Sequence, residues 1–290
     1  AEPLTYRADQ ALAPGTLVRV PLGAREVLGV VWDHHLPPPA PELAAQVRPI
    51  AAALDGLPPL TADWRALVAF AARYYQRALG EVALAALPPQ LRTLTGVQLA
   101  RRLKRQAGAQ ANDALTETEP TLPPLSDEQA AALQAIEAGR GPFLLFGATG
   151  SGKTEVYMRA AARALTRNPM AQVLVLVPEI NLTPQLEARF AARFGRDAVV
   201  ALHSGLTPAQ RLGHWLAAHL GRARIVLGTR VAVLASIPHL ALIVVDEEHD
   251  PSYKQQEGAR YSARDLAVYR GHLNGAQVVL GSATPSLESW

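Results

Sequence analysis

One stretch decides the fold of this chain: Gly147-Ala148-Thr149-Gly150-Ser151-Gly152-Lys153-Thr154 (GATGSGKT). It matches G-x-x-x-x-G-K-[ST] in full, follows a short apolar run and opens a helical stretch, which is the context that a phosphate-binding loop requires. Its glycines let backbone N–H groups converge on phosphate oxygens, and the helix N-terminus adds partial positive charge. The alternative is a glycine-rich turn that binds nothing. The residues predicted to bind nucleotide phosphates are Gly147, Thr149, Gly150, Ser151, Gly152, Lys153 and Thr154.

Within this loop, two side chains carry separate tasks. Lys153 is predicted to reach the β- and γ-phosphates, and the Thr154 hydroxyl to bind Mg²⁺. A second candidate lies at Asp246-Glu247-Glu248-His249, directly after the apolar run 241–245. An acid at the carboxyl end of a parallel strand can hold the same Mg²⁺, so Asp246 is the predicted metal ligand. Glu247 can polarise the attacking water, whereas His249 either joins this catalytic group or caps a turn.

Short apolar segments that hardly alternate surround the loop, and helical stretches separate several of them. This pattern predicts an α/β fold with a parallel sheet that helices cover on both faces. The predicted strands are Phe143–Phe146, Val173–Val177, Val199–Leu202, Arg224–Leu227, Ala241–Val245 and Gln277–Leu280. The predicted helices include Thr154–Leu165, Thr183–Phe194 and Pro208–Leu220.

Two further segments flank this unit. Ser126 and Gln129 form an S-x-x-Q capping box, which needs no ligand, but the Gln129 amide could also meet an adenine edge. The two interpretations are compatible. After the last predicted strand, Gly281-Ser282-Ala283-Thr284-Pro285 places small hydroxyl residues where they could sense the γ-phosphate, or forms only a turn.

Composition narrows the class of protein. The 290 residues are 49% hydrophobic and 18% charged, with a net charge of +3. A chain this long and apolar can bury a core, no apolar run is long enough for a membrane helix, and no secretory signal is seen. With no cysteine, thiolate zinc sites and disulfides are excluded in this chain. We expect a cytoplasmic protein of about two domains without a membrane partner.

The N-terminal part shows a different pattern of residues, with short β-branched runs before a helical stretch. Thr16–Leu22 and Arg25–Trp32 are β-branched runs joined around Gly23, which predicts a hairpin, and Val47–Leu54 is a further candidate strand. Asp63–Leu79 has apolar residues at helical spacing. The predicted organisation is a small β-rich domain at 1–91, a linker at 92–124 and the α/β unit at 125–290. A basic cluster in the linker is either a solvated helix face or a nucleic-acid contact: Arg101, Arg102, Lys104 and Arg105.

Six segments, taken together and in this order, resemble the superfamily 2 helicases: GATGSGKTEVY, VPEINLTPQ, LHSGLTPAQR, GTR, DEEHDPSYKQQEGARYSARD and GSATPSLES. More narrowly, they are similar to the bacterial replication-restart helicases of the primosomal protein N′ family, because YKQQEG-R-Y-ARD follows the DExH box. VPLGAREVLGVV and ARYYQRALGEVALAALPPQLR resemble that family's N-terminal domain for binding a DNA 3′ end. The resemblance covers nearly all of the chain except residues 92–124.

The resemblance implies a DNA helicase that moves 3′ to 5′, uses ATP and Mg²⁺ and acts in primosome assembly at stalled forks. Lys153, Asp246, Glu247 and His249 would be its catalytic residues, in a RecA-like lobe of DExH type. Gln129 would recognise adenine. Implied partners are DNA (stalled forks, single strands and a leading-strand 3′ end), other primosome proteins and the single-stranded-DNA-binding protein. An alternative is a fork-binding scaffold whose nucleotide site is vestigial.

Residues 253–265 resemble the family's aromatic-rich loop, which senses single-stranded DNA and couples it to ATP hydrolysis. The composition of this segment suits that role independently, since aromatic rings can stack on bases and basic side chains can meet phosphates. In the N-terminal domain, Gly23 and Arg48 align with the 3′-end pocket, where they are either pocket residues or a turn glycine and a solvated arginine. The predicted DNA-binding residues are Gly23, Arg48, Tyr253, Lys254, Arg260, Tyr261 and Arg264.

The chain also departs from the family. Leu4-Thr5 stands where the family has an aromatic–acidic pair before a tyrosine. Val231 replaces a usual serine, and Ser262 a usual histidine. The linker at 92–124 is too short for the winged-helix domain that the family usually carries there. We expect the chain to be an N-terminal portion, with the second motor lobe, its arginine finger and the zinc segment beyond residue 290. Alone it should bind ATP and forked DNA but hydrolyse and unwind poorly.

Overall fold

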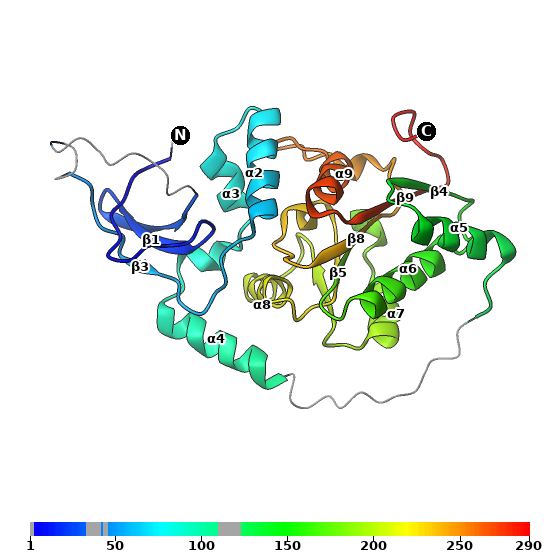
Figure 1. Cartoon of the computed structure of the whole chain (residues 1–290), viewed down its shortest axis with the longest axis horizontal. Coiled ribbons are helices and arrows are strands. Elements are labelled where there is room, and N and C mark those ends of the chain that lie inside the picture. Colours follow the sequence, from blue (N-terminus) through cyan, green and yellow to red (C-terminus); the bar gives the residue numbers. More distant parts are fainter. Residues whose placement is uncertain (1–2, 33–41, 43–45, 110–122) are drawn as a thin grey trace.

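A computed structural model gives the fold and describes residues 3–32, 42, 46–109 and 123–290, with side chains in the last helix before the gap described only through Lys104. The chain forms a small antiparallel sheet of three strands and a larger sheet of six strands, joined by helices (Figure 1). Residues 33–41 and 43–45 of the N-terminal region and residues 110–122 of the predicted linker lie outside the described residues. The predicted architecture, a β-rich unit followed by an α/β lobe, is confirmed.

The small sheet has the order β2-β1-β3. Strands β1 (Leu17–Leu22) and β2 (Arg25–Val30) pair antiparallel in an unbroken register from Leu17↔Val30 to Leu22↔Arg25. Gly23 takes a positive φ of 60° in the turn between them, which glycine adopts without the Cβ penalty. The hairpin is therefore confirmed, but the third strand is shorter than expected. Of the predicted third strand, Ala52–Ala53 forms β3 and pairs with β1, whereas Arg48 and Ile50 bond to Arg7 instead.

Helices follow the small sheet. Thr61 caps the start of α2 (Ala62–Tyr74) by accepting from the Trp64 N–H. The single helix predicted to run to residue 79 is wrong at its end, since Gln76 has a φ of 52° and turns the chain. Next come α3 (Leu79–Ala85), the 3-10 helix η1 (Pro89–Arg92) and α4 (Gly96–Ala109). In α4, Leu99 is buried while Arg101 and Lys104 are exposed, which fits a solvated basic face.

The six-stranded sheet has the order β4-β9-β8-β5-β7-β6, and every neighbouring pair is parallel. The predicted strands and helices are found within a few residues of their expected ends. The strands are β4 (Phe143–Phe146), β5 (Gln172–Leu176), β6 (Val199–Leu202), β7 (Ile225–Gly228), β8 (Leu240–Val245) and β9 (Gln277–Ser282). The α-helices are α5 (Asp127–Ala138), α6 (Lys153–Arg167), α7 (Pro184–Phe194), α8 (Pro208–His219) and α9 (Ala263–Asn274). Three 3-10 helices also occur: η2 (Glu179–Asn181), η3 (Arg230–Leu234) and η4 (Pro251–Tyr253).

Successive residues of the strands point to opposite faces of this sheet and pack into two separate hydrophobic cores, one on each face. On one face, Val173, Val175 and Val244 pack with side chains of α5, α6 and α7. On the other face, Leu174 and Leu176 pack with α8 and α9. Burial on both faces explains why the strands are apolar throughout rather than alternating.

Helix α2 joins the second of these cores, so the N-terminal region and the lobe share one hydrophobic cluster. The helix lies between the small sheet and the lobe (Figure 1). Trp64 is 2% exposed, and its indole N–H donates to the Leu234 carbonyl at 2.8 Å. The rings of Phe70 and Tyr269 stack with centroids 3.8 Å apart. The seam between α2 and the lobe is therefore a packed interior, which the sequence patterns did not predict.

Among the helices that the structure describes, none has the length and apolar character that crossing a membrane would require.

A buried histidine crosses the same seam. The His219 ring is 2% exposed and bridges the Pro58 carbonyl at Nε2 and the Ser236 hydroxyl at Nδ1, both at 2.9 Å. Since a carbonyl only accepts, Nε2 carries the proton and Nδ1 accepts from Ser236. Burial lowers the pKa of His219 from 6.5 to about 4, against a smaller opposing effect of the Pro58 bond.

Stability is predicted to fall as the pH drops from about 6.5 to about 4. The unfolded chain takes up a proton on His219 in this window, whereas the folded chain does not, so acid favours unfolding by up to about 3 kcal/mol. Urea unfolding of the wild type and of His219→Gln at several pH values measures this, and the variant should show a flatter pH dependence. His272→Gln, at an exposed histidine of α9, is the matched control and should leave the slope unchanged. Equal slopes for wild type and His219→Gln would contradict the prediction.

Candidate nucleotide and DNA site

The glycine-rich loop lies at the carboxyl edge of the parallel sheet, between β4 and α6. Residues 148–151 are exposed, and Gly150 and Gly152 have φ values of 82° and 86°. The Gly147 N–H donates to the Ser282 carbonyl at 3.1 Å, which fixes the start of the loop to the end of β9. The loop therefore presents exposed backbone at the N-terminus of a 15-residue helix, the arrangement that phosphate binding needs.

Gln129 ties the first turn of α5 to this loop. Its Oε1 accepts from the Ser126 N–H at 3.1 Å, completing the capping box, and its Nε2 donates to the Ser151 carbonyl at 2.9 Å. A Cβ at Gly152 would collide with the Gln129 amide, so this close approach requires glycine. The capping interpretation is confirmed, and the contact with adenine stays a prediction.

Lys153 and Glu247 face one another across the site. The Lys153 ammonium donates to the Gly147 carbonyl at 2.8 Å and lies 3.6 Å from Glu247 Oε1. Glu247 has a φ of 46°, in the left-handed region that side chains other than glycine rarely adopt. Such backbone strain is typical of functional sites, where the surrounding structure holds it in place.

Asp246 follows β8 directly and is fixed by α6. Its N–H donates to the Leu176 carbonyl at 2.8 Å, and its Oδ1 accepts from the Tyr157 hydroxyl at 3.0 Å. Burial raises the pKa of the Asp246 carboxyl, while the Tyr157 hydrogen bond acts in the opposite direction. A Cβ at Gly281 would collide with the Tyr157 hydroxyl, so the glycine of GSATP makes room for this bond.

His249 connects the DEEH segment to the GSATP segment. Its Nδ1 lies 2.7 Å from Ser282 Oγ and 3.8 Å from Glu247 Oε2, and its Nε2 lies 3.3 Å from Thr284 Oγ1. The segment after β9 is therefore joined through side chains to the carboxylate expected to activate water, rather than being a separate turn.

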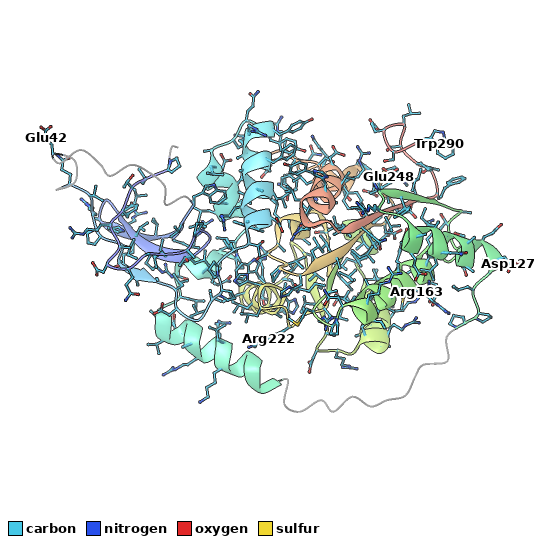
Figure 2. All side chains as sticks on the ribbon, in the orientation of Figure 1. Glu42, Asp127, Arg163, Arg222, Glu248 and Trp290 are labelled. Carbon is cyan, nitrogen blue, oxygen red and sulfur yellow. The ribbon has the colours of Figure 1, made fainter. Side chains whose placement is uncertain are left out.

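Glu248, which is labelled in Figure 2, was not singled out from the sequence, yet its carboxylate accepts four hydrogen bonds. Its carboxylate accepts from the N–H and hydroxyl of Ser286 at 2.8 and 3.0 Å, from the Ser289 hydroxyl at 2.8 Å and from Arg264 at 3.4 Å. Burial alone would raise the pKa of Glu248, but these hydrogen bonds and the Arg264 charge hold it below its usual value. Glu248 thus joins the DEEH segment to α9 and to the residues after GSATP.

The residues present fit a magnesium ion held together with a nucleotide. Mg²⁺ commonly takes one or two protein oxygen ligands plus phosphates and waters, rather than a cage of side chains. Thr154 lies in the first turn of α6, directly after the phosphate loop, and Asp246 follows β8 and is bonded to Tyr157 of the same helix. Over the described residues, no group of three or more His, Cys, Asp or Glu side chains could hold a metal by itself.

Two predicted DNA-binding residues do not fit base stacking in this structure. Tyr253 is 3% and Tyr261 9% exposed, and the Tyr253 hydroxyl donates to the Leu176 carbonyl at 3.0 Å. Both rings belong to the hydrophobic core on the α8–α9 face. Neither ring offers a face to a base, because the aromatic residues of this loop anchor it to the lobe instead.

The basic residues of the same loop divide into two groups. Lys254 and Arg260 are exposed and remain candidates for phosphate contacts. Arg264 forms ion pairs with Asp265 at 2.8 Å and with Glu248 at 3.4 Å. Its guanidinium is therefore part of the hydrogen-bond network around Glu248. Arg230, in GTR, was not singled out; its Nε donates to Gln255 at 2.7 Å and connects GTR to the loop.

In the N-terminal unit, the structure brings the two predicted pocket residues together. Arg48 donates through Nη1 to the Gly23 carbonyl at 3.1 Å, and Tyr6 donates to the Pro21 carbonyl at 2.9 Å. The arginine is therefore fixed beside the hairpin turn. Recognition of a 3′ end by these residues stays a prediction.

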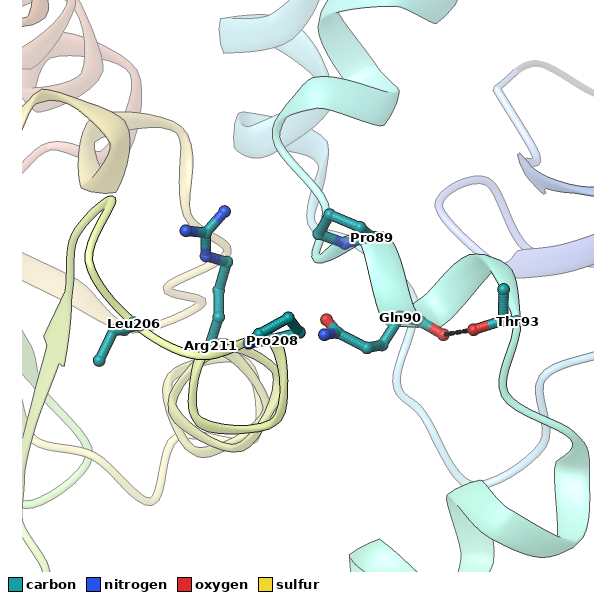
Figure 3. Close-up of a pocket in the computed structure, with 6 residues that line it drawn as sticks. All are labelled: Pro89, Gln90, Thr93, Leu206, Pro208 and Arg211. Carbon is teal, nitrogen blue, oxygen red and sulfur yellow. Dashed lines mark hydrogen bonds between the residues drawn. The ribbon is translucent and has the colours of Figure 1, made fainter.

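A separate cavity of about 320 Å³ lies between η1 and the start of α8 (Figure 3). Arg211 on α8 lines it opposite Pro89 and Gln90. No residue of the glycine-rich loop or of the DEEH segment borders this cavity.

Comparison with known families and proteins agrees with this geometry. The DEAD/DEAH box helicase family matches residues 126–289, and the 3′ DNA-binding domain found in PriA proteins matches residues 1–88. The chain is 34% identical over 289 residues to the replication restart protein PriA of Rickettsia felis and 38% identical over 294 residues to that of Treponema pallidum. In both cases 99% of this chain aligns, and it spans 42% of the relative's length.

Solved structures with a similar arrangement include the RecG protein bound to a three-way DNA junction, with a TM-score of 0.43, 20% identity and coverage of 78% of this chain and 27% of that one. The helicase MrfA bound to DNA gives a TM-score of 0.45 at 17% identity, covering 58% and 24% of the two chains. The matched family covers more than half of the chain and includes the loop, DEEH and GSATP segments described above. The chain therefore belongs to the DEAD/DEAH box helicase family, and its residues resemble the N-terminal portion of PriA replication restart proteins.

Proposed function

We propose that this chain is the N-terminal portion of a bacterial replication-restart helicase and that it binds ATP and DNA. One observation carries the proposal: Lys153 and Glu247 face each other at 3.6 Å beside Asp246, at the sheet edge where the phosphate loop begins. This arrangement can hold a nucleoside triphosphate with Mg²⁺. An N-terminal unit that matches a 3′ DNA-binding domain supports DNA as the second ligand.

The proposed chemistry is hydrolysis of the γ-phosphate. On binding, the Lys153 ammonium would exchange its loop carbonyls and Glu247 for phosphate oxygens. The Glu247 carboxylate would then be free to orient and polarise water. A bound Mg²⁺ would supply charge neutralisation of the phosphates, with Thr154 and Asp246 as its protein ligands.

The proposed biological role is primosome assembly at stalled forks in the bacterial cytoplasm. The DNA ligands would be single strands and forks with a leading-strand 3′ end, through Lys254, Arg260 and the Gly23–Arg48 pocket. Other primosome proteins and the single-stranded-DNA-binding protein are proposed partners of the whole protein. Unwinding in the 3′-to-5′ direction would need two lobes that open and close.

Lys153→Ala is predicted to weaken binding of ATP·Mg²⁺ by at least about tenfold, because a charge-assisted contact to phosphate is lost. Calorimetric titration with a non-hydrolysable ATP analogue and Mg²⁺ measures the affinity. Lys104→Ala, which removes an exposed ammonium on α4, is the matched control and should bind as the wild type does. No measurable affinity in the wild type would favour the DNA-binding scaffold with a vestigial nucleotide site.

Hydrolysis by the 290-residue chain alone is predicted to be slow, and added DNA should change it little. An arginine supplied to the γ-phosphate from outside the phosphate-binding lobe raises the rate by about 10³–10⁵ in P-loop enzymes, and the described residues form one such lobe. Release of inorganic phosphate, measured with and without single-stranded and forked DNA, tests this. Glu247→Gln should abolish the residual rate while retaining ATP·Mg²⁺ affinity. Robust turnover that DNA stimulates would contradict the prediction.

A further inference from the structure

The loop at 254–262 has a fixed base and an exposed tip. Lys254 and Ser262 pair in an antiparallel bridge, and the Gln255 N–H donates to the Tyr261 carbonyl at 2.8 Å. Tyr253, just before Lys254, and Tyr261, just before Ser262, both have buried side chains. Residues 256–258 and Arg260 are exposed. The geometry of the tip therefore depends on what holds the two sides of the base.

One side chain from the N-terminal region contacts both sides of that base. The Tyr75 hydroxyl accepts from the Ser262 N–H at 3.1 Å. The Tyr75 ring lies beneath the Lys254 ammonium, 5.5 Å from nitrogen to ring centroid, which is a cation–π contact. Tyr75 thus links α2 to the first and the last residue of the loop.

The position of Tyr75 is itself well defined. It is the C-terminal cap residue of α2, its N–H donates to the Ala71 carbonyl at 3.0 Å, and the left-handed Gln76 follows. The same helix is fixed to α9 by the stack of Phe70 on Tyr269. The hydroxyl is therefore presented from a packed helix rather than from a mobile terminus.

The residue that Tyr75 contacts also starts α9. Ser262 is the N-cap of that helix, and its Oγ accepts from the Asp265 N–H at 3.3 Å. Two residues along, Arg264 reaches the Glu248 carboxylate, next to the strained Glu247. The contact between Tyr75 and Ser262 is thus continuous with the network that ends at the nucleotide site.

We propose that Tyr75 is a positioning residue that holds the 254–262 loop in the geometry that binds single-stranded DNA. The inference rests on the proposed function, in which Lys254 and Arg260 contact DNA phosphates. A loop that is already ordered loses less conformational entropy when DNA binds, so removing the restraint weakens binding. The N-terminal unit would contribute in this way to DNA binding by the helicase lobe as well as through its own pocket.

The test compares Tyr75→Phe, Tyr75→Ala and the control Tyr74→Phe, which removes a hydroxyl from the neighbouring tyrosine that is 66% exposed. Each chain is titrated with an oligothymidylate and with ATP·Mg²⁺, and amide hydrogen exchange is followed in peptides covering the loop and the parallel sheet. Tyr75→Phe should weaken oligothymidylate binding by about threefold to tenfold, as expected for one lost hydrogen bond. Tyr75→Ala should weaken it further, because the ring beneath Lys254 is also lost.

The expected pattern is selective. Exchange should accelerate at the loop and at Ser262 in Tyr75→Phe, while the sheet peptides and the ATP·Mg²⁺ affinity stay as in the wild type and in Tyr74→Phe. Equal or tighter oligothymidylate binding by Tyr75→Phe would overturn the inference. So would a parallel loss of ATP affinity and sheet protection, since that would show a general structural defect. If the wild type binds no single-stranded DNA, the proposed DNA-binding role of the loop fails, and this inference fails with it.

Discussion

Helix α2 packs into the same hydrophobic core as α8, α9 and one face of the parallel sheet. The position of the N-terminal unit relative to the helicase lobe depends on this contact. Trp64 is buried between α2 and the lobe, and its indole N–H donates to the Leu234 carbonyl. Separating α2 from the lobe would expose apolar side chains to water and break this hydrogen bond, and both changes cost free energy. The contact sets where Tyr75 lies and therefore where the loop at 254–262 begins and ends. It makes the N-terminal unit a structural part of the helicase lobe.

The nucleotide site depends on a second constraint, the order of strands in the sheet. β9 lies between β4 and β8, so the residues after these three strands meet at one edge. This adjacency brings Lys153, Asp246 and Ser282 together although they are far apart in the sequence. Polar contacts then join them: Tyr157 to Asp246, His249 to Ser282, and Glu248 to Ser286. Arg264, two residues after the loop at 254–262, contacts Glu248 at the same edge.

Local patterns predicted much of this molecule. The GATGSGKT stretch, the apolar strands and the hairpin around Gly23 are short-range features, and each is found where it was expected. The capping box at Ser126 is equally local. The strand order was not predictable from one sequence, because it depends on long-range packing.

The predictions that were wrong or missing also concern long-range packing. Tyr253 and Tyr261 look like stacking residues by composition, yet they are buried because the loop folds back on the lobe. Glu248 had no signal of its own beyond its place between Glu247 and His249, since its donors come from residues 16 to 41 positions later. Helix α2 ends early because Gln76 adopts a left-handed conformation. No glycine or proline at this position indicates the end of the helix in the sequence.

The central claim is that the N-terminal unit and the helicase lobe form one cooperative structure through α2. Differential scanning calorimetry of the chain tests it most directly. The shared core predicts a single transition in which the calorimetric and van't Hoff enthalpies agree, and ATP·Mg²⁺ should move that whole transition to higher temperature. Two separate transitions, with nucleotide raising only one of them, would contradict the account.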